Sequence, residues 1–150
     1  MKYSTLQQFA TVNPENLTPE NCKLSNLVNG IWEGTQDYEN LIDPMTGKVM
    51  GLVPLTMRDE SKAFIDSLKA VPKYGLHNPL FNVERYLLYG KVSQKAATLM
   101  NTKEVQDFFT RLIQRVCPKS DAQARGEVIV TTKFLENFGG DNVRYLARSF

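Results

Sequence analysis

The sequence has few of the residues that build metal sites or disulfide frameworks. Its 150 residues include one histidine and two cysteines, which are too few for an intramolecular zinc finger or a histidine-rich metal cage. Cys22 and Cys117 lie far apart in the chain. Secreted disulfide scaffolds have a denser cysteine pattern, so we expect two free thiols in a reducing compartment.

Long apolar runs and a strong charge of one sign are also missing. No apolar stretch approaches the roughly 20 residues of a membrane span. Residues 1–25 have neither the basic start and apolar core of a secretory signal nor the arginines of a mitochondrial presequence. Eighteen Lys and Arg against sixteen Asp and Glu give a net charge of +2. This balance predicts no nucleic-acid partner, and we expect no membrane span.

The remaining composition is typical of one globular domain, with 42% hydrophobic and 23% charged residues. Residues 1–23 are polar and contain Pro14 and Pro19, so we expect an irregular N-terminal arm with at most one short helical turn. The packed part is expected over residues 24–150.

The first elements predicted along the chain are extended segments. Leu24–Trp32 carries a modest strand signal. Tyr38–Ile42 and Val49–Val53 are expected to pair antiparallel, because Pro44 presets its φ angle and Gly47 can adopt a positive φ in the turn between them.

Pro54 is expected to end the second of these strands, after which the apolar period becomes helical. About five helices are predicted, so the segment is expected to be α+β, a pair of antiparallel strands followed by helices. The expected N-caps are Asp59, Asn101 with Glu104, Ser120 with Gln123, and Asp141, and the expected helix ends are Pro72, Pro118 and Gly139–Gly140. The apolar faces are Phe64, Leu68 and Val71; Leu88, Val92, Ala96 and Leu99; Val105, Phe108, Phe109, Leu112, Ile113 and Val116; Val128, Leu135 and Phe138; and Val143, Leu146, Ala147 and Phe150.

The last predicted helix stops on an apolar residue, Phe150, without a polar cap. Natural domain ends are usually polar and frayed. We therefore expect a segment that is truncated from a longer protein.

Candidate catalytic groups are few. Cys117 at a helix end and Cys22 in the arm are more simply explained as structural thiols than as nucleophiles. His77 in a Gly-His-Asn-Pro loop is more simply explained as a solvated or backbone-bonded residue than as a catalytic one. Catalysis needs a nucleophile or an acid–base group with partners. None of these residues has an evident partner in the sequence.

Two charged or anion-binding patterns also have simpler explanations. Arg111 and Arg115 share a helix face that is expected to be solvated or ion-paired. Gly139–Asp141 could receive an anion at a helix start, but no strand precedes it, so a helix break is the simpler interpretation. The residues by themselves predict no self-sufficient active site.

Several longer stretches resemble known enzymes. NLVNGIW and DPMTGKV, at Asn26–Trp32 and Asp43–Val49, resemble the opening strands of aldehyde dehydrogenases. Three more stretches are similar to the plant-type branch of Δ1-pyrroline-5-carboxylate dehydrogenase: Ser67–Tyr89, Asp107–Ser120 and Lys133–Phe150. The resemblance runs from about Leu24 to the last residue.

This resemblance implies an α/β aldehyde dehydrogenase-like fold for the full enzyme, with residues 24–150 as the N-terminal segment of its cofactor-binding domain. It implies NAD-dependent oxidation of L-glutamate γ-semialdehyde to glutamate in mitochondrial proline breakdown. The family's catalytic cysteine, general-base glutamate, oxyanion asparagine and cofactor-binding sheet are expected beyond Phe150, and neither Cys22 nor Cys117 matches the nucleophile motif. No catalytic residue and no bound NAD are expected for this chain alone.

The resemblance carries over one group of site residues. In related aldehyde dehydrogenases, the residue five positions before an "(L/V)-R-Y" signature lines the substrate tunnel. The signature here is Val143–Tyr145, which points to Phe138, with plain core packing as its alternative. Asn142 and Leu146, one turn further on, are expected to share that wall.

The resemblance also implies partners and a compartment. The rest of the dehydrogenase, or sister subunits of a homo-oligomer, would cover an apolar stripe through Phe134, Phe138, Val143, Leu146 and Phe150. Without that cover, the isolated chain is expected to be marginally stable, molten or self-associating. A mitochondrial matrix location is implied, with the cytoplasm as the alternative. A second hypothesis is a catalytically inactive relic that serves as a structural or assembly subunit. An unrelated helical binding domain would require the matching stretches to be coincidental.

Overall fold

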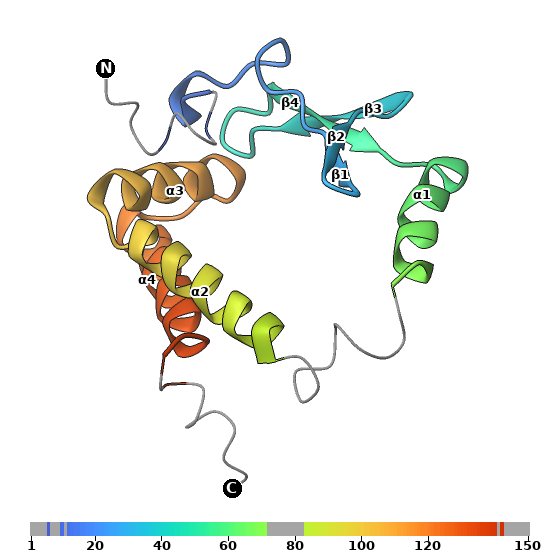
Figure 1. Ribbon diagram of the computed structural model, residues 1–150. Helices are drawn as coiled ribbons and strands as arrows, with labels where there is room; N and C mark the ends of the chain where they lie inside the picture. The colour runs from blue at the N-terminus through green and yellow to red at the C-terminus, as the bar shows by residue number, and fades with distance from the viewer. Residues whose placement is uncertain (1–5, 7–9, 11, 72–82, 141, 143–150) are drawn as a thin grey trace, which may run out of the picture. The chain divides into compact units, whose positions relative to one another are not determined.

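The computed structural model describes residues 6, 10, 12–71, 83–140 and 142, and the chain divides into two compact units (Figure 1). One unit, Val12–Lys73, holds the strands and the first helix. The other unit consists of Met1–Thr11 and Tyr74–Phe150 and holds three helices of the described part.

The first strands of the Val12–Lys73 unit form a short hairpin. Strand β1 (Asn26–Val28) pairs antiparallel with β2 (Ile31–Glu33). The two residues between them, Asn29 and Gly30, have φ angles of 51° and 80°. Positive φ at both positions is the geometry of a type I′ turn, for which Asn-Gly is the preferred sequence. The single strand predicted over Leu24–Trp32 is therefore wrong, because this dipeptide folds it back on itself.

The predicted antiparallel pair and its turn are confirmed. Strand β3 (Asp37–Ile42) pairs with β4 (Val49–Leu55). In the turn, the backbone N–H of Gly47 donates to the carbonyl of Asp43 over 2.8 Å, and Gly47 has a φ of 69°. The buried Asp43 side chain also accepts from the N–H of Met45 at 2.9 Å.

Strand β4 continues through Pro54, which was predicted to end it. Two residues earlier, Leu52 directs its N–H away from β3 and donates to the carbonyl of Cys22 over 2.8 Å. Pro54 lies on the same side of the strand, so its missing N–H removes no hydrogen bond to β3. The carbonyl of Leu52 accepts from Leu24 at 2.9 Å, which completes the pairing on this edge.

The pairing of β4 with the Cys22–Leu24 segment needs a glycine at position 51. A Cβ atom on Gly51 would lie 2.8 Å from the Cys22 Sγ atom and 2.9 Å from its carbonyl oxygen. Side chains do not fit at such distances without moving the neighbouring backbone. Before this segment, residues 14–16 form one short 3₁₀ helix, η2 (Pro14–Asn16).

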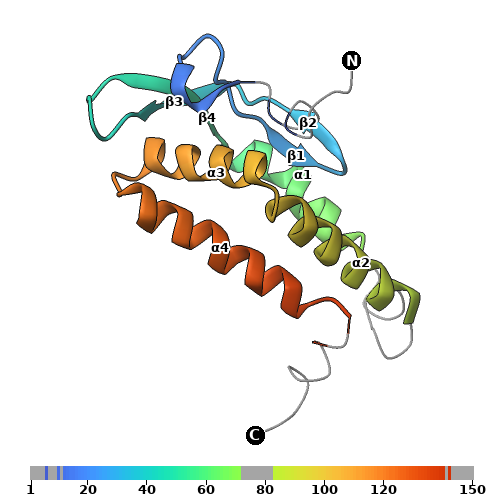
Figure 2. The same ribbon diagram turned by 90° about the vertical axis from the view of Figure 1, so that its left-hand side faces the viewer.

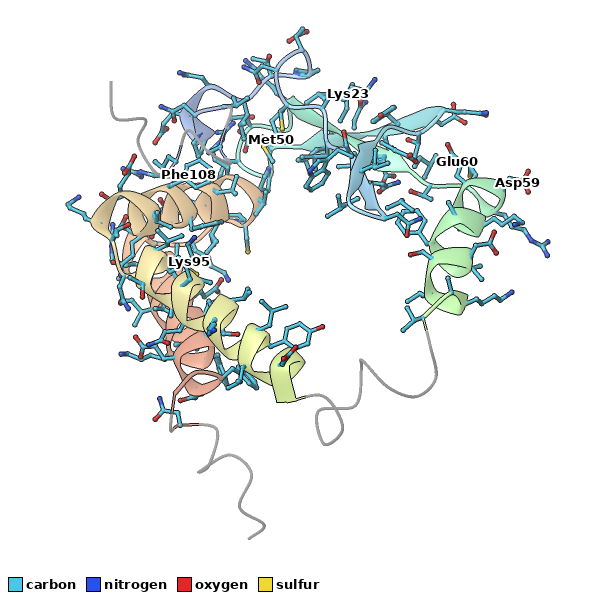
Figure 3. All side chains as sticks on the ribbon, in the orientation of Figure 1. Lys23, Met50, Asp59, Glu60, Lys95 and Phe108 are labelled. Carbon is cyan, nitrogen blue, oxygen red and sulfur yellow. The ribbon has the colours of Figure 1, made fainter. Side chains whose placement is uncertain are left out.

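Helix α1 (Arg58–Lys69) begins one residue after Met57, so the prediction of Asp59 as its cap is wrong. The carboxylate of Glu60 accepts from the backbone N–H groups of Met57 and Gln36, each over 2.9 Å. These two bonds lower the pKa of Glu60 below its ordinary value. In Figure 3 Glu60 lies on the side of α1 towards the strands, whereas Asp59 points away from them.

The other unit is built from α2 (Val83–Met100), α3 (Lys103–Val116) and α4 (Asp121–Asn137). Helix α4 packs against both α2 and α3 (Figures 1 and 2). The buried side chains of these helices are small or medium-sized: Ala97, Val105, Thr110, Ala124, Val128 and Thr132.

Two of the three caps predicted in this unit fall on described residues, and one of these is confirmed. Ser120 and Gln123 form the expected capping box at the start of α4. Helix α3 is instead preceded by Thr102, so Asn101 is not its cap. The N–H of Asn101 donates to the carbonyl of Ala97 over 3.0 Å, which makes Asn101 a continuation of the α2 hydrogen-bond pattern.

The face that α2 turns towards α4 also differs from the predicted one. Leu88 and Val92 are exposed, whereas Ala97 is buried. A Cβ on Gly139, just after α4, would lie 3.3 Å from the Cβ of Gln94 and 3.6 Å from the carbonyl of Gly90. Small residues let the two backbones approach, and the bulkier side chains are left on the outer surface.

The α+β class is confirmed, with four α-helices and two antiparallel hairpins in the described residues. The fifth predicted helix, with Asp141 as its cap, lies outside the described residues apart from Asn142. No helix in the described part is both long enough and apolar enough to cross a membrane.

We expect Gly51→Ala to destabilise the Val12–Lys73 unit by roughly 1–3 kcal/mol, because the added methyl group collides with Cys22. Urea unfolding and the amide exchange rates of Leu24 and Leu52 would measure the loss. Gly126→Ala is the matched control: nothing lies within 4 Å of the added Cβ on α4, so it should stabilise the chain by about 0.5–1 kcal/mol. Equal effects of both substitutions would contradict the proposed collision.

Candidate functional site

A polar cavity of about 360 Å³ lies between the C-terminal parts of α2 and α4. Five polar side chains line it together with the glycines that follow α4: Gln94, Thr98, Asn101, Glu136 and Asn142, with Gly139 and Gly140. Helix α2 supplies the first two of these side chains, and Asn101 follows its end. Asn142, a residue of the predicted tunnel wall, is part of this lining.

Glu136 is the most connected side chain of this cavity. One carboxylate oxygen accepts from the side-chain amide of Asn101 at 3.0 Å, and the other accepts from the ammonium group of Lys133 at 2.8 Å. These two donors, Lys133 first, hold the pKa of Glu136 below its ordinary value. The carboxylate therefore stays ionised at neutral pH and keeps both partners in place.

The three predicted wall residues have different positions. Phe138 is the C-cap of α4 and its side chain is 55% exposed, outside the cavity lining. Asn142 lines the cavity, and its side-chain amide donates to the carbonyl of Glu136 over 3.2 Å. Leu146 lies outside the described residues. The assignment of this wall to a substrate tunnel stays a prediction.

Sequence reasoning missed Asn101 and Glu136 as site residues. Asn101 matched a helix cap, and Glu136, although it lies in the resembling stretch Lys133–Phe150, was given no role of its own. The two residues are 35 positions apart, so no local spacing pairs them. The i, i+3 spacing of Lys133 and Glu136 was the available local signal, and it is common on helix surfaces.

The cysteines have the surroundings of structural thiols. Burial raises the pKa of the Cys22 thiol, which is the opposite of nucleophile activation. Cys117 is the half-buried C-cap of α3, and its N–H donates to the carbonyl of Ile113 over 2.8 Å. His77 lies outside the described residues.

The other sequence candidates are integrated into helices or lie beyond the described part. Arg111 donates to the side chain of Gln114 over 3.1 Å. Gly140 has a φ of 56°, and Asp141, the expected start of an anion site, is not among the described residues. No group of three His, Cys, Asp or Glu side chains that could hold a metal gathers in the described ranges.

The described residues do not fit a nicotinamide dinucleotide. Such cofactors bind at parallel sheets, where a glycine-rich turn leads from a strand into a helix. The described strands form two separate two-stranded antiparallel sheets. The connection from β4 to α1 runs through Thr56 and Met57 and contains no glycine.

Comparisons with known proteins identify two similar plant proteins, whereas no family model matches the chain. The first is the mitochondrial delta-1-pyrroline-5-carboxylate dehydrogenase 12A1 of Arabidopsis thaliana, 50% identical over 143 residues, which are 95% of this chain and 26% of that protein. The second is a probable aldehyde dehydrogenase of Linum usitatissimum, 48% identical over 150 residues, which are 99% of this chain and 27% of that protein.

The chain thus spans about a quarter of the length of the curated relatives that it matches. The resemblance drawn from the sequence motifs is confirmed: over nearly its whole length the chain is similar to the N-terminal segment of aldehyde dehydrogenases, including a plant Δ1-pyrroline-5-carboxylate dehydrogenase.

The lowered pKa of Glu136 predicts a contribution to acid sensitivity. A carboxylate with a lowered folded-state pKa stabilises the fold above its ordinary pKa, and this stabilisation is lost as the pH falls through the folded-state value. We expect the free energy of unfolding, measured in urea between roughly pH 6 and pH 3, to fall less steeply for Glu136→Gln than for the wild type. Glu104→Gln, in the first turn of α3, is the control. If the free energy of unfolding fell equally steeply with pH in the wild type and in Glu136→Gln, the contacts of the carboxylate would not stabilise the fold.

Proposed function

We propose that this chain is the N-terminal segment of an NAD-dependent Δ1-pyrroline-5-carboxylate dehydrogenase, which oxidises L-glutamate γ-semialdehyde to glutamate. The observation that carries the proposal is the 50% identity, over 95% of the chain, to an Arabidopsis thaliana protein named for that activity. The probable aldehyde dehydrogenase of Linum usitatissimum supports the same general reaction class.

In this proposal the chain acts as a scaffold. Its described residues do not form a dinucleotide site, and its two cysteines have structural surroundings. The nucleophilic cysteine, the general-base glutamate, the oxyanion-stabilising asparagine and the NAD-binding sheet would come from the rest of the enzyme. When bound there, NAD would accept the hydride.

The contribution of this chain to substrate binding would come from Phe138, Asn142 and Leu146. The exposed ring of Phe138 offers apolar surface to an aliphatic chain, and Asn142 reaches the polar cavity that contains Glu136. A wall that supplied both an apolar ring and polar groups would suit a substrate with an aliphatic chain and a charged amino-acid end. This match supports the assignment of the segment to the aldehyde site.

The outer surface of α4 supports a covering partner. Val130, Phe134 and Phe138 follow one another at four-residue spacing and are 54%, 61% and 55% exposed. On the same helix Ala124 and Val128 are buried. A helix that is apolar on two sides is typical of one that is covered on both. We assign the cover of Val130 and Phe134 to the remainder of the dehydrogenase or to a sister subunit of a homo-oligomer, and Phe138, at the end of the stripe, to the proposed aldehyde wall.

We also propose the mitochondrial matrix as the compartment, because the Arabidopsis thaliana relative is labelled mitochondrial. The cytoplasm is the alternative, and fractionation of cells that express the complete natural polypeptide would distinguish the two.

Turnover by the complete natural polypeptide tests the proposed activity. We expect NAD+ to be reduced with L-glutamate γ-semialdehyde, with a higher kcat/KM than with propanal, because the proposed wall binds the longer, charged substrate. NADH absorbance would measure both rates. If no aldehyde is oxidised, the proposed activity is wrong and the structural or assembly subunit is favoured.

The matched control is a chain of residues 1–150 titrated with NAD+ in a calorimeter. No heat of binding is expected, because no described strand leads through a glycine-rich turn into a helix, as a dinucleotide site requires. Micromolar binding by this chain would contradict the scaffold role.

The exposed stripe on α4 predicts the behaviour of residues 1–150 in isolation. We expect binding of an apolar dye and a melting temperature that depends on protein concentration, because Val130, Phe134 and Phe138 have no cover. Phe134→Gln should reduce both effects, while Leu68→Gln, on an exposed site of α1, serves as the control. A sharp melting transition that is independent of concentration, without dye binding, would show that the stripe needs no partner.

A further inference from the structure

A pair of glycines, Gly139 and Gly140, separates two of the predicted wall residues, Phe138 at the end of α4 and Asn142 beyond it. Gly140 has a φ of 56°, a conformation that glycine adopts readily and other residues rarely do. Two glycines in succession leave the backbone many alternative directions. A contact outside the glycine pair therefore has to set where Asn142 stands relative to Phe138.

Glu136 supplies that contact through both its backbone and its side chain. Its carbonyl accepts from the N–H of Gly139 and from the side-chain amide of Asn142, each over 3.2 Å. Its carboxylate accepts from Asn101, beyond the end of α2, and from Lys133 on its own helix. One residue thus connects the end of α2, the last turn of α4 and the segment that follows.

The anchor on the α2 side is itself held in place. The backbone N–H of Asn101 is bonded to Ala97, and the hydroxyl of the next residue, Thr102, donates to the carbonyl of Leu99 over 2.7 Å. The buried Gly139 packs against Gln94, which brings the two helix ends close enough for this bridge. The bond from Asn101 to Glu136 therefore connects the glycine segment to a part of the fold that is itself held by hydrogen bonds.

We propose that Glu136 is a positioning residue that, through its bridge to Asn101, fixes the Phe138–Asn142 segment and thereby sets the enzyme's selectivity between aldehydes. The selectivity part rests on the proposed function, in which this segment lines the aldehyde site. The bridge itself is a property of the fold, so the two parts are tested by separate measurements.

Hydrogen exchange on the complete natural polypeptide tests the bridge. In Glu136→Ala and in Asn101→Ala we expect the amides of residues 138–142 to exchange about threefold to tenfold faster than in the wild type. The amides of Val128 and Thr132 in the core of α4 report whether the helix itself stays folded. Glu136→Gln should restore the wild-type rate, because its amide oxygen still accepts from Asn101.

The matched control is Glu127→Ala, which lies on α4 like Glu136 and removes an ion pair with Lys119, before the helix, without touching the bridge. It should leave exchange in residues 138–142 unchanged. If the alanine variants at positions 101 and 136 leave that exchange unchanged as well, the positioning role is wrong. Asn101→Ala keeps the carboxylate and its bond to Lys133, so it remains informative if Glu136→Ala unfolds α4.

Steady-state kinetics on the same variants test the consequence for selectivity. We expect the ratio of kcat/KM for L-glutamate γ-semialdehyde to that for propanal to fall about tenfold in Glu136→Ala, and to recover in Glu136→Gln. A faster exchange with an unchanged ratio would overturn the selectivity role. A wild type that oxidises no aldehyde would overturn both the proposed function and the selectivity role, while the exchange data would still decide the bridge.

Discussion

The helical unit depends on the close approach of two backbones at Gly139. This residue is buried, and a Cβ atom there would lie 3.3 Å from Gln94 on α2. The approach brings the end of α4 beside the end of α2, which allows Asn101 to donate to Glu136. The polar cavity and the direction of the segment after α4 both follow from that contact, since Asn101, Glu136 and Gly139 are among its lining residues.

Helix α4 has apolar side chains on two sides. Small and medium-sized residues such as Ala124 and Val128 face the neighbouring helices, where short side chains permit close packing. Larger side chains such as Phe134 are left on the outer surface. Burying that surface requires a second layer, which in the proposed enzyme is the rest of the dehydrogenase or a sister subunit.

Local signals predicted the structure well where the partners were close in the sequence. Ser120 and Gln123 cap α4 reciprocally, and Gly47 closes the turn between β3 and β4 as expected. The Asn29–Gly30 dipeptide is also a local signal for a hairpin turn. The prediction of a single strand over Leu24–Trp32 did not use it. The predictions failed where a distant group competes for a polar atom. Asn101 has the form of a cap, but its amide donates to Glu136, 35 positions away.

The sequence by itself determined the α+β class, the C-terminal ends of α3 and α4 and the similarity to aldehyde dehydrogenases, because capping residues, prolines, glycines and long identical stretches act or are recognised locally. Only the tertiary structure decided which faces are buried and which polar groups meet. Glycine contacts at Gly51 and Gly139 set how closely segments approach, and this distance is a property of two pieces of chain together. Neither piece alone encodes it, so the cavity around Glu136 could be found only once both had been placed.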